Sequence, residues 1–303
     1  GTKGGALNMS VSKEALKAAV KSVWIRSLTE IQPDILAGLT AARNQERSPR
    51  GREYLDILIQ NALKATKDHT VICQDTGVPT FFIKTSLGFP YQGSLRETFD
   101  EAMREMTLDE FPMRPMVVHP LTRADRCDNT GANVPLLHIE LDEGLDYMEI
   151  TALPKGAGTG IWGTLRFFPP SVGVEGVKKF VVDSVLRAGS NPCPPLIVGV
   201  GLGGTLEEVA RLATVATARP IDQRHPEPEI AALEQELCDA LNMSQIGPMG
   251  MGGDTTALAV NIEYSGTHKP WLPAAVNINC WPGRKATCRI DRNGQVKQCG
   301  GER

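Results

Sequence analysis

Residues 191–204, NPCPPLIVGVGLGG, carry the clearest fold signal in this chain. The apolar run 196–200 has the length of a buried strand, and Thr205 with Glu208 has the spacing of a capping box at a helix start. A buried strand that leads directly into a helix is typical of α/β proteins. The stretch therefore predicts a strand from Leu196 and then a helix through about Ala218.

Two chemical interpretations of this stretch are open. Gly199, Gly201 and Gly204 spell G-x-G-x-x-G, the fingerprint of a dinucleotide-binding turn. That fingerprint normally opens its domain, whereas nearly two hundred residues precede it here, and Asp222 lies in a proline-rich loop. The glycines would equally permit a tight turn and close packing. Cys193, held between two prolines, indicates instead a position that binds something, such as a metal.

The rest of the chain extends the α/β pattern. Helical spacing of apolar residues predicts helices around residues 16–23, 34–44, 52–67, 95–106, 176–188 and 228–241. Strands are predicted on both sides of the turn within residues 69–86, at 136–141 and 147–153 as a pair, at 257–264 and at 273–280. We expect a mixed α+β fold of the α/β class, with a helical N-terminal segment followed by a mixed β-sheet surrounded by helices.

The composition limits the possible partners. The chain has 303 residues, 41% hydrophobic and 22% charged, with a net charge of −3, which favours neither nucleic acid nor a membrane surface. No secretory signal is evident, and seven cysteines without disulfide-type spacing predict a reducing, cytoplasmic location. We expect residues 1–9 to be a remnant ahead of a native start, 10–290 to form one domain, and 291–303 to be a frayed polar tail.

Three of the seven cysteines have distinctive surroundings. Cys73, Cys193 and Cys280 each lie where a predicted strand or helix meets a turn rich in Gly, Pro or Asn. By contrast, Cys238 has the position of a helix packing residue, and three others are expected to be exposed: Cys127, Cys288 and Cys299. Three thiolates from distant loops can hold an iron–sulfur cluster in which one iron lacks a protein ligand. A zinc-binding structural subunit is an alternative.

Seven motifs, in this order, resemble the class I iron–sulfur fumarases and L(+)-tartrate dehydratases: CQDTG, NTGANVP, KGAG, NPCPPLIVGVGLGG, RPI, GPMGMGGDTTALAV and LPAAVNINC. The chain is most similar to the α subunit of the two-subunit forms, from about Leu16 to Arg284. The resemblance implies a [4Fe–4S] cluster with one open iron on Cys73, Cys193 and Cys280, which aerobic handling can remove. It also implies that the glycines after Cys193 shape the loop beside that ligand.

The resemblance further assigns site residues. Asp75 is implied in acid–base chemistry, with an Asx-turn or cap as its structural alternative, and Gln74 in substrate binding. Arg114 would grip a substrate carboxylate unless it is an ordinary surface arginine. Gly158 would bring backbone N–H groups to a carboxylate or simply permit a turn. His268, twelve residues before Cys280, would lie at the substrate.

The implied function is a hydro-lyase that reversibly dehydrates a 2-hydroxydicarboxylate, first of all L-malate to fumarate. L(+)-tartrate or another diacid is the alternative substrate; tartrate is considered because CWPGRK after the last cysteine is closer to tartrate dehydratases. A β subunit in a hetero-oligomer would supply the base that removes the carbon-bound proton, so the chain alone is expected to be nearly inactive. A dinucleotide-dependent oxidoreductase is the distant alternative.

Overall fold

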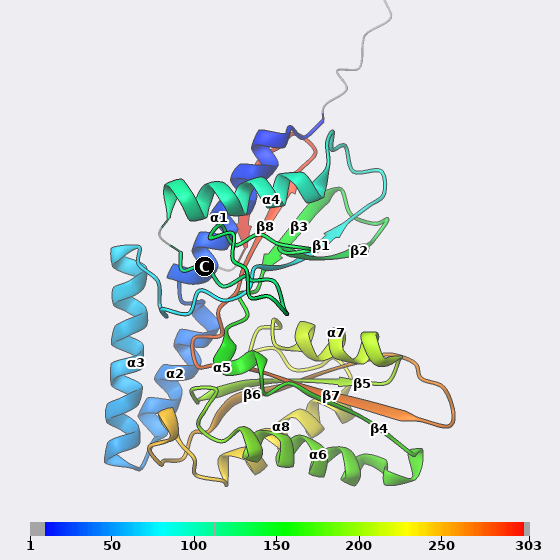
Figure 1. Ribbon diagram of the computed structural model, residues 1–303. Helices are drawn as coiled ribbons and strands as arrows, with labels where there is room; N and C mark the ends of the chain where they lie inside the picture. Colours follow the sequence, from blue (N-terminus) through cyan, green and yellow to red (C-terminus); the bar gives the residue numbers. More distant parts are fainter. Residues whose placement is uncertain (1–9, 112, 300–303) are drawn as a thin grey trace, which may run out of the picture. The chain divides into compact units, whose positions relative to one another are not determined.

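The computed structural model describes residues 10–111 and 113–299, which form two compact units (Figure 1). The first unit comprises the chain up to Thr29, Cys73–Lys155 and the segment from Lys285; the second comprises Glu30–Ile72 and Gly156–Arg284. Each unit has its own sheet and helices, so the predicted α/β class is confirmed, with the strands divided over two sheets. The suggested remnant at residues 1–9 lies outside the described residues.

The first unit is built on a five-stranded sheet in the order β2-β1-β3-β8-β9. Its elements are α1 (Lys13–Thr29), β1 (Thr80–Thr85), α4 (Leu95–Glu105), the short π-helix η1 (Met106–Glu110), β2 (Leu136–Leu141), β3 (Tyr147–Ala152), β8 (Ala286–Asp291) and β9 (Val296–Cys299). Fully buried Phe81 on β1 packs against Trp24 of α1 and Phe99 of α4, with ring centroids 5.5 and 4.9 Å away. These contacts hold both helices on one face of the sheet.

Strands β2 and β3 form as predicted but do not pair with each other. Strand β1 lies between them, parallel to β2 and antiparallel to β3. The loop 142–146 crosses the end of β1, where the Asp142 N–H donates to the Thr85 carbonyl at 3.0 Å. The predicted hairpin is therefore wrong, because the central position lets β1 bury Phe81 and Ile83 with strands on both sides. The strand predicted before the Gly-Pro turn is absent from residues 70–77.

The end of the chain was predicted to fray, yet its described part forms a hairpin. Strand β9 pairs antiparallel with β8, and Gly294 adopts a left-handed φ of 81° in the turn. Cys288 on β8, expected to be exposed, is buried at 0% beside Ile290. Cys288 is buried because it shares the inward face of β8 with Ala286 and Ile290.

The second unit contains a four-stranded sheet in the order β4-β7-β5-β6, in which β5 is parallel to β6 and antiparallel to β7. Its elements are α2 (Pro33–Gln45), α3 (Pro49–Asp68), α5 (Ala157–Gly160), β4 (Thr164–Phe168), η2 (Pro170–Val172), α6 (Gly173–Ala188), β5 (Leu196–Leu202), α7 (Leu206–Ala216), α8 (Pro228–Asn242), η3 (Pro248–Gly250), β6 (Ala257–Tyr264) and β7 (Leu272–Asn279). Helix α7 covers one face of the sheet, and α6 with α8 covers the other (Figure 1).

The glycines of the G-x-G-x-x-G pattern serve the packing of α7 on β5. A Cβ atom at Gly199 would lie 2.1 Å from the Ala213 carbonyl oxygen, and one at Gly201 would lie 2.2 Å from the Val209 oxygen. The pattern thus follows from close packing, the structural alternative. The expectation that these glycines shape the loop beside Cys193 is wrong, because they lie within β5 and at its far end.

Helix α7 begins where predicted, but not through the predicted capping box. The Thr205 hydroxyl donates to the Glu207 carboxylate at 2.7 Å rather than accepting from the helix backbone. Glu208 pairs instead with Arg211 at 2.8 Å. The capping-box prediction is therefore wrong, since both of its side chains have other partners.

We predict that Gly199→Ala or Gly201→Ala lowers the free energy of unfolding by about 1–3 kcal/mol or more, because a methyl group cannot fit against the α7 backbone. Urea denaturation followed by circular dichroism measures this change. Gly266→Ala is the matched control, since a Cβ there meets nothing within 4 Å. Equal stability of all three variants would contradict the packing explanation.

Candidate functional site

In the first unit, the loop before β1 presents Cys73, Gln74 and Asp75. The Gly77 N–H donates to Asp75 Oδ1 at 2.9 Å, so the Asx-turn alternative is present in the structure. An Asx-turn orients the carboxyl group of Asp75, so it is compatible with a proton-transfer role. Cys73 is half-buried, and its Sγ lies 3.6 Å from Gln74 Oε1.

The same loop holds the segment that carries Arg114. The Thr76 hydroxyl donates to the Arg114 carbonyl at 3.1 Å, which places the exposed arginine next to the Cys73 loop. The NTG motif also holds the Arg114 segment, because the Met116 N–H donates to Asn129 Oδ1 at 2.9 Å. The first unit therefore places the backbone of Arg114 beside the loop that carries Cys73, Gln74 and Asp75.

In the second unit, Cys193 and Cys280 lie at the same end of the sheet. Cys280 directly follows β7, whose last residue Asn279 is opposite Ile197 of β5. The Trp281 N–H donates to the Cys193 carbonyl at 3.1 Å. Both thiols are half-buried, and Cys193 has a left-handed φ of 59°. The antiparallel pairing of β5 with β7 thus joins two residues that lie 87 positions apart.

Two further motifs meet at the Cys193 turn. Gly158 lies against it, since a Cβ at this glycine would be 3.4 Å from the Asn191 carbonyl oxygen. The loop of GPMGMGGD is attached through the Met249 N–H, which donates to the Pro194 carbonyl at 2.8 Å. The second unit therefore groups Gly158, Cys193 and Cys280.

The base of the GPMGMGGD loop is fixed by charge. The buried Glu46 carboxylate accepts from the Asp254 N–H at 2.9 Å, and Arg47 pairs with Asp254 at 2.7 Å. Hydrogen bonds from Arg47 hold the pKa of Asp254 at about 2. Asp254 thus anchors the loop.

His268 lies at the opposite end of this sheet. Its loop joins the far end of β5, where the Gly204 N–H donates to the Gly266 carbonyl at 3.1 Å. The eight residues of β7 separate it from Cys280, a distance of roughly 25 Å along an extended strand. The ring packs edge-on to Trp271 with centroids 5.2 Å apart. The second unit therefore does not bring His268 to its own two cysteines.

Comparison with known proteins shows which family the chain belongs to. The model of the family described as fumarate hydratase (Fumerase) matches residues 17–289, which include every motif above. The chain belongs to the fumarate hydratase family.

Curated relatives of this fumarate hydratase family member match most of its length. A protein of Methanocaldococcus jannaschii with the provisional name L(+)-tartrate dehydratase subunit alpha is 42% identical over 85% of this chain and 91% of its own. Proteins named L(+)-tartrate dehydratase subunit alpha in Escherichia coli K12 and Shigella sonnei are 34% identical, over 86% of both chains. The likeness thus extends over both units.

Sequence reasoning attached no role to two arginines of this family member. Arg219, in the RPI motif, pairs with the fully buried Glu234 and with Glu263 at 2.8 Å, so it joins α8 to β6. Arg284 is only 5% exposed, four residues after Cys280. A buried arginine requires partners, so Arg284 has a structural or binding role. The sequence signal that could have identified it is its place directly after the loop of Cys280.

Two of the remaining cysteines, Cys238 and Cys288, are buried. Burial raises the pKa of Cys238 to about 11 and that of Cys288 to about 12, so both stay protonated at neutral pH. The packing role predicted for Cys238 is confirmed. Because thiolates rather than thiols bind metals, these two cysteines are poor ligands.

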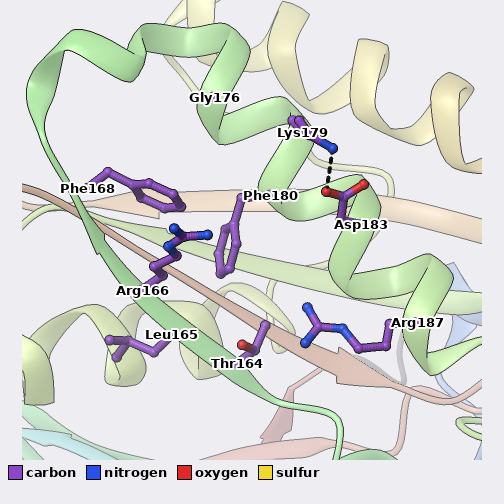
Figure 2. Close-up of a pocket in the computed structure, with 9 residues that line it drawn as sticks. All are labelled: Thr164, Leu165, Arg166, Phe168, Gly176, Lys179, Phe180, Asp183 and Arg187. Atoms are coloured by element: carbon purple, nitrogen blue, oxygen red, sulfur yellow. Dashed lines mark hydrogen bonds and ion pairs between the residues drawn. The ribbon is translucent and has the colours of Figure 1, made fainter.

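A cavity of about 330 Å³ lies between β4 and α6 of the second unit (Figure 2). Phe168 and Phe180 meet edge-on on its wall, and the Arg166 guanidinium lies 4.9 Å from the Phe168 ring centroid. Lys179 pairs with Asp183 at 2.7 Å, whereas Arg187 has no ion-pair partner within the part of the chain that the structure describes. The cavity is basic and suits an anion, but none of the predicted site residues lines it.

Among residues 10–111 and 113–299, no ready group of three or more His, Cys, Asp or Glu side chains is positioned to hold a metal ion. Cys73 belongs to the first unit and the other two candidate ligands to the second. Within the same described ranges, no helix combines the length and apolar character needed to cross a lipid bilayer.

We predict that Cys193→Gly is more stable than Cys193→Ala by about 1 kcal/mol, because a left-handed φ costs residues other than glycine roughly that much. Urea denaturation of the two apo variants measures the difference. Cys299→Gly and Cys299→Ala form the control pair, since Cys299 lies in strand β9, where alanine should be favoured. An advantage for alanine at both positions would contradict the strained conformation.

Proposed function

We propose that this chain is the cluster-binding catalytic α subunit of a hydro-lyase acting on a 2-hydroxydicarboxylate. The observation that carries the proposal is the meeting of Cys193 and Cys280 at one end of a sheet, in a member of the fumarate hydratase family. The subunit names of the relatives support a β-type partner in a hetero-oligomer. A cluster and free thiols suit a reducing cytoplasm.

The donor set fits a [4Fe–4S] cluster. Cys73, Cys193 and Cys280 are half-buried thiols on turns, whereas the two fully buried thiols have raised pKa values. Cys193 and Cys280 are also joined through the backbone, so their loops have little freedom to separate. With one iron lacking a protein ligand, such a cluster supplies a Lewis acid for the substrate hydroxyl.

The residues of the first unit would perform binding and proton transfer. Arg114 is exposed and presents a guanidinium suited to a bidentate pair with a substrate carboxylate. The Asp75 side chain, oriented by its bond from Gly77, would act as the general acid: its carboxylic acid form gives the proton that turns the departing hydroxyl into water and is left as the carboxylate. Gln74 lies beside it as a hydrogen-bonding side chain. In the second unit, the exposed backbone at Gly158 would donate to the other carboxylate.

Dehydration balances as the loss of one water molecule. The carbon–oxygen bond of the hydroxyl carbon breaks, a base removes a proton from the neighbouring carbon, and a carbon–carbon double bond forms. The base would come from the β-type partner. His268 stays a prediction as a substrate contact, since it lies at the opposite end of its sheet from both cysteines of its unit.

Two diacids are the leading substrates. The family description favours L-malate and fumarate, whereas the names of the relatives favour L(+)-tartrate. L-malate and L(+)-tartrate each carry a hydroxyl next to one carboxylate and a removable proton on the next carbon. The same protein residues could therefore act on either substrate. Comparison of kcat/KM for the two, with the β-type partner present, assigns the substrate.

We predict that the anaerobically reconstituted chain binds about four iron and four sulfide ions, and that Cys193→Ser loses most of both. Chemical iron and acid-labile sulfide analysis measures the loading. Cys127→Ser, which changes an exposed thiol in a loop, should load like the wild type. Loading that is indifferent to Cys193, or metal without sulfide, would refute the cluster.

We predict that Asp75→Asn lowers kcat by about 10²- to 10⁴-fold without changing the free energy of unfolding. An asparagine oxygen still accepts from the Gly77 N–H, whereas Asp75→Ala loses this bond and about 0.5–1.5 kcal/mol. Kinetics in the presence of the partner and urea denaturation separate the two effects. Full activity of Asp75→Asn would leave only the Asx-turn role.

A further inference from the structure

Strand β2 is an edge strand of the first unit with an apolar, open side. In the sheet order β2-β1-β3-β8-β9 it is paired on one side only, among the strands of the described residues (Figure 1). Ile139 is 52% exposed and Leu141 58%. An exposed apolar edge is a template for pairing with another strand, and natural edge strands usually carry charges or prolines that prevent it.

The backbone shows which residues of β2 face outward. The Leu136 N–H donates to the Pro79 carbonyl at 2.8 Å, and the Asp142 N–H donates to the Thr85 carbonyl at 3.0 Å. Bonding direction alternates along a strand, so the even-numbered residues bond to β1. Leu137, Ile139 and Leu141 therefore direct their N–H and C=O groups to the open side.

The sequence of this edge is complementary to itself. We propose that β2 pairs antiparallel with β2 of a second copy of this chain, across a two-fold axis at Ile139. In that register Ile139 opposes itself, and Leu137 opposes Leu141, so every outward backbone group meets an outward counterpart. On the other face, His138 opposes Glu140, an attractive pair.

Neighbouring registers are worse. An axis at Glu140 sets two carboxylates directly opposite each other, and an axis at His138 sets two imidazoles opposite each other. Both also leave one outward leucine without an apolar partner. The axis at Ile139 alone satisfies backbone, apolar and charge requirements together, which favours a second copy over an unrelated strand.

The size of the contact sets its strength. A stable interface typically buries about 1,600 Å², more than one pair of six-residue strands supplies. We therefore expect a concentration-dependent dimer. The inference is independent of the proposed function, because it rests on the surface of the first unit and not on catalysis.

Sedimentation equilibrium of the full chain over a range of concentrations tests the dimer. Ile139→Lys would place two ammonium groups in contact and raise the dissociation constant about tenfold or more. Leu121→Lys is the control, because Leu121 is 86% exposed in the same unit but lies outside β2. A wild type that stays monomeric, or a dimer unaffected by Ile139→Lys, would overturn the proposal.

Two further variants test the register. His138→Glu should weaken the dimer by setting carboxylates opposite each other, and adding Glu140→Lys should restore it. Ile139→Cys should form an intermolecular disulfide under mild oxidation, since directly opposed Cα atoms lie about 5.5 Å apart, whereas Leu121→Cys and the wild type should not. If Ile139→Lys instead abolishes binding of the β-type partner to a monomeric chain, a different protein occupies this edge and the proposal fails.

Discussion

The antiparallel pairing of β5 with β7 is the interaction on which the second unit depends. It sets Ile197 opposite Asn279, so the turn before one strand meets the turn after the other. Cys193 and Cys280 are neighbours for this reason, and the backbone bond from Trp281 to Cys193 closes the arrangement. The Met249 loop is attached to the Cys193 turn by a backbone hydrogen bond, and Gly158 lies close to the same turn.

In the first unit, a single loop positions most of the candidate residues. The Cys73 loop orients Asp75 through its own backbone and holds the Arg114 segment through the Thr76 hydroxyl. Side chains placed by short backbone contacts need little reorganisation when a substrate binds, which favours catalysis by positioning. Each unit thus fixes the backbone that carries its own candidate residues.

Local features of the fold could be predicted from the sequence, whereas pairing could not. The helical ranges agree closely with the structure because apolar periodicity is a local signal, as at α3 and α8. The insertion of β1 between β2 and β3 depends on the burial of Phe81, which no local pattern specifies. Strand β4 was missed because its alternation between polar and apolar residues covers only the first four of five residues, TLRFF, directly after a glycine-rich loop.

The candidate site shows the same limit. Turn chemistry identified Cys73, Cys193 and Cys280, and the structure places all three on turns. The twelve positions between His268 and Cys280 suggested proximity, but they contain an extended strand, so nearness in sequence became distance in space. Glycines after Cys193 were attributed to its loop, although the Ala213 backbone explains Gly199.

The burial of Cys238 and Cys288 also determines which thiols of the protein are oxidised first. Oxidants and alkylating agents attack thiolates, and two thiols with pKa values of about 11 and 12 offer almost none at neutral pH. Oxidative damage to the thiols of this chain therefore falls first on the accessible cysteines, including the proposed ligands, while both cores keep theirs reduced.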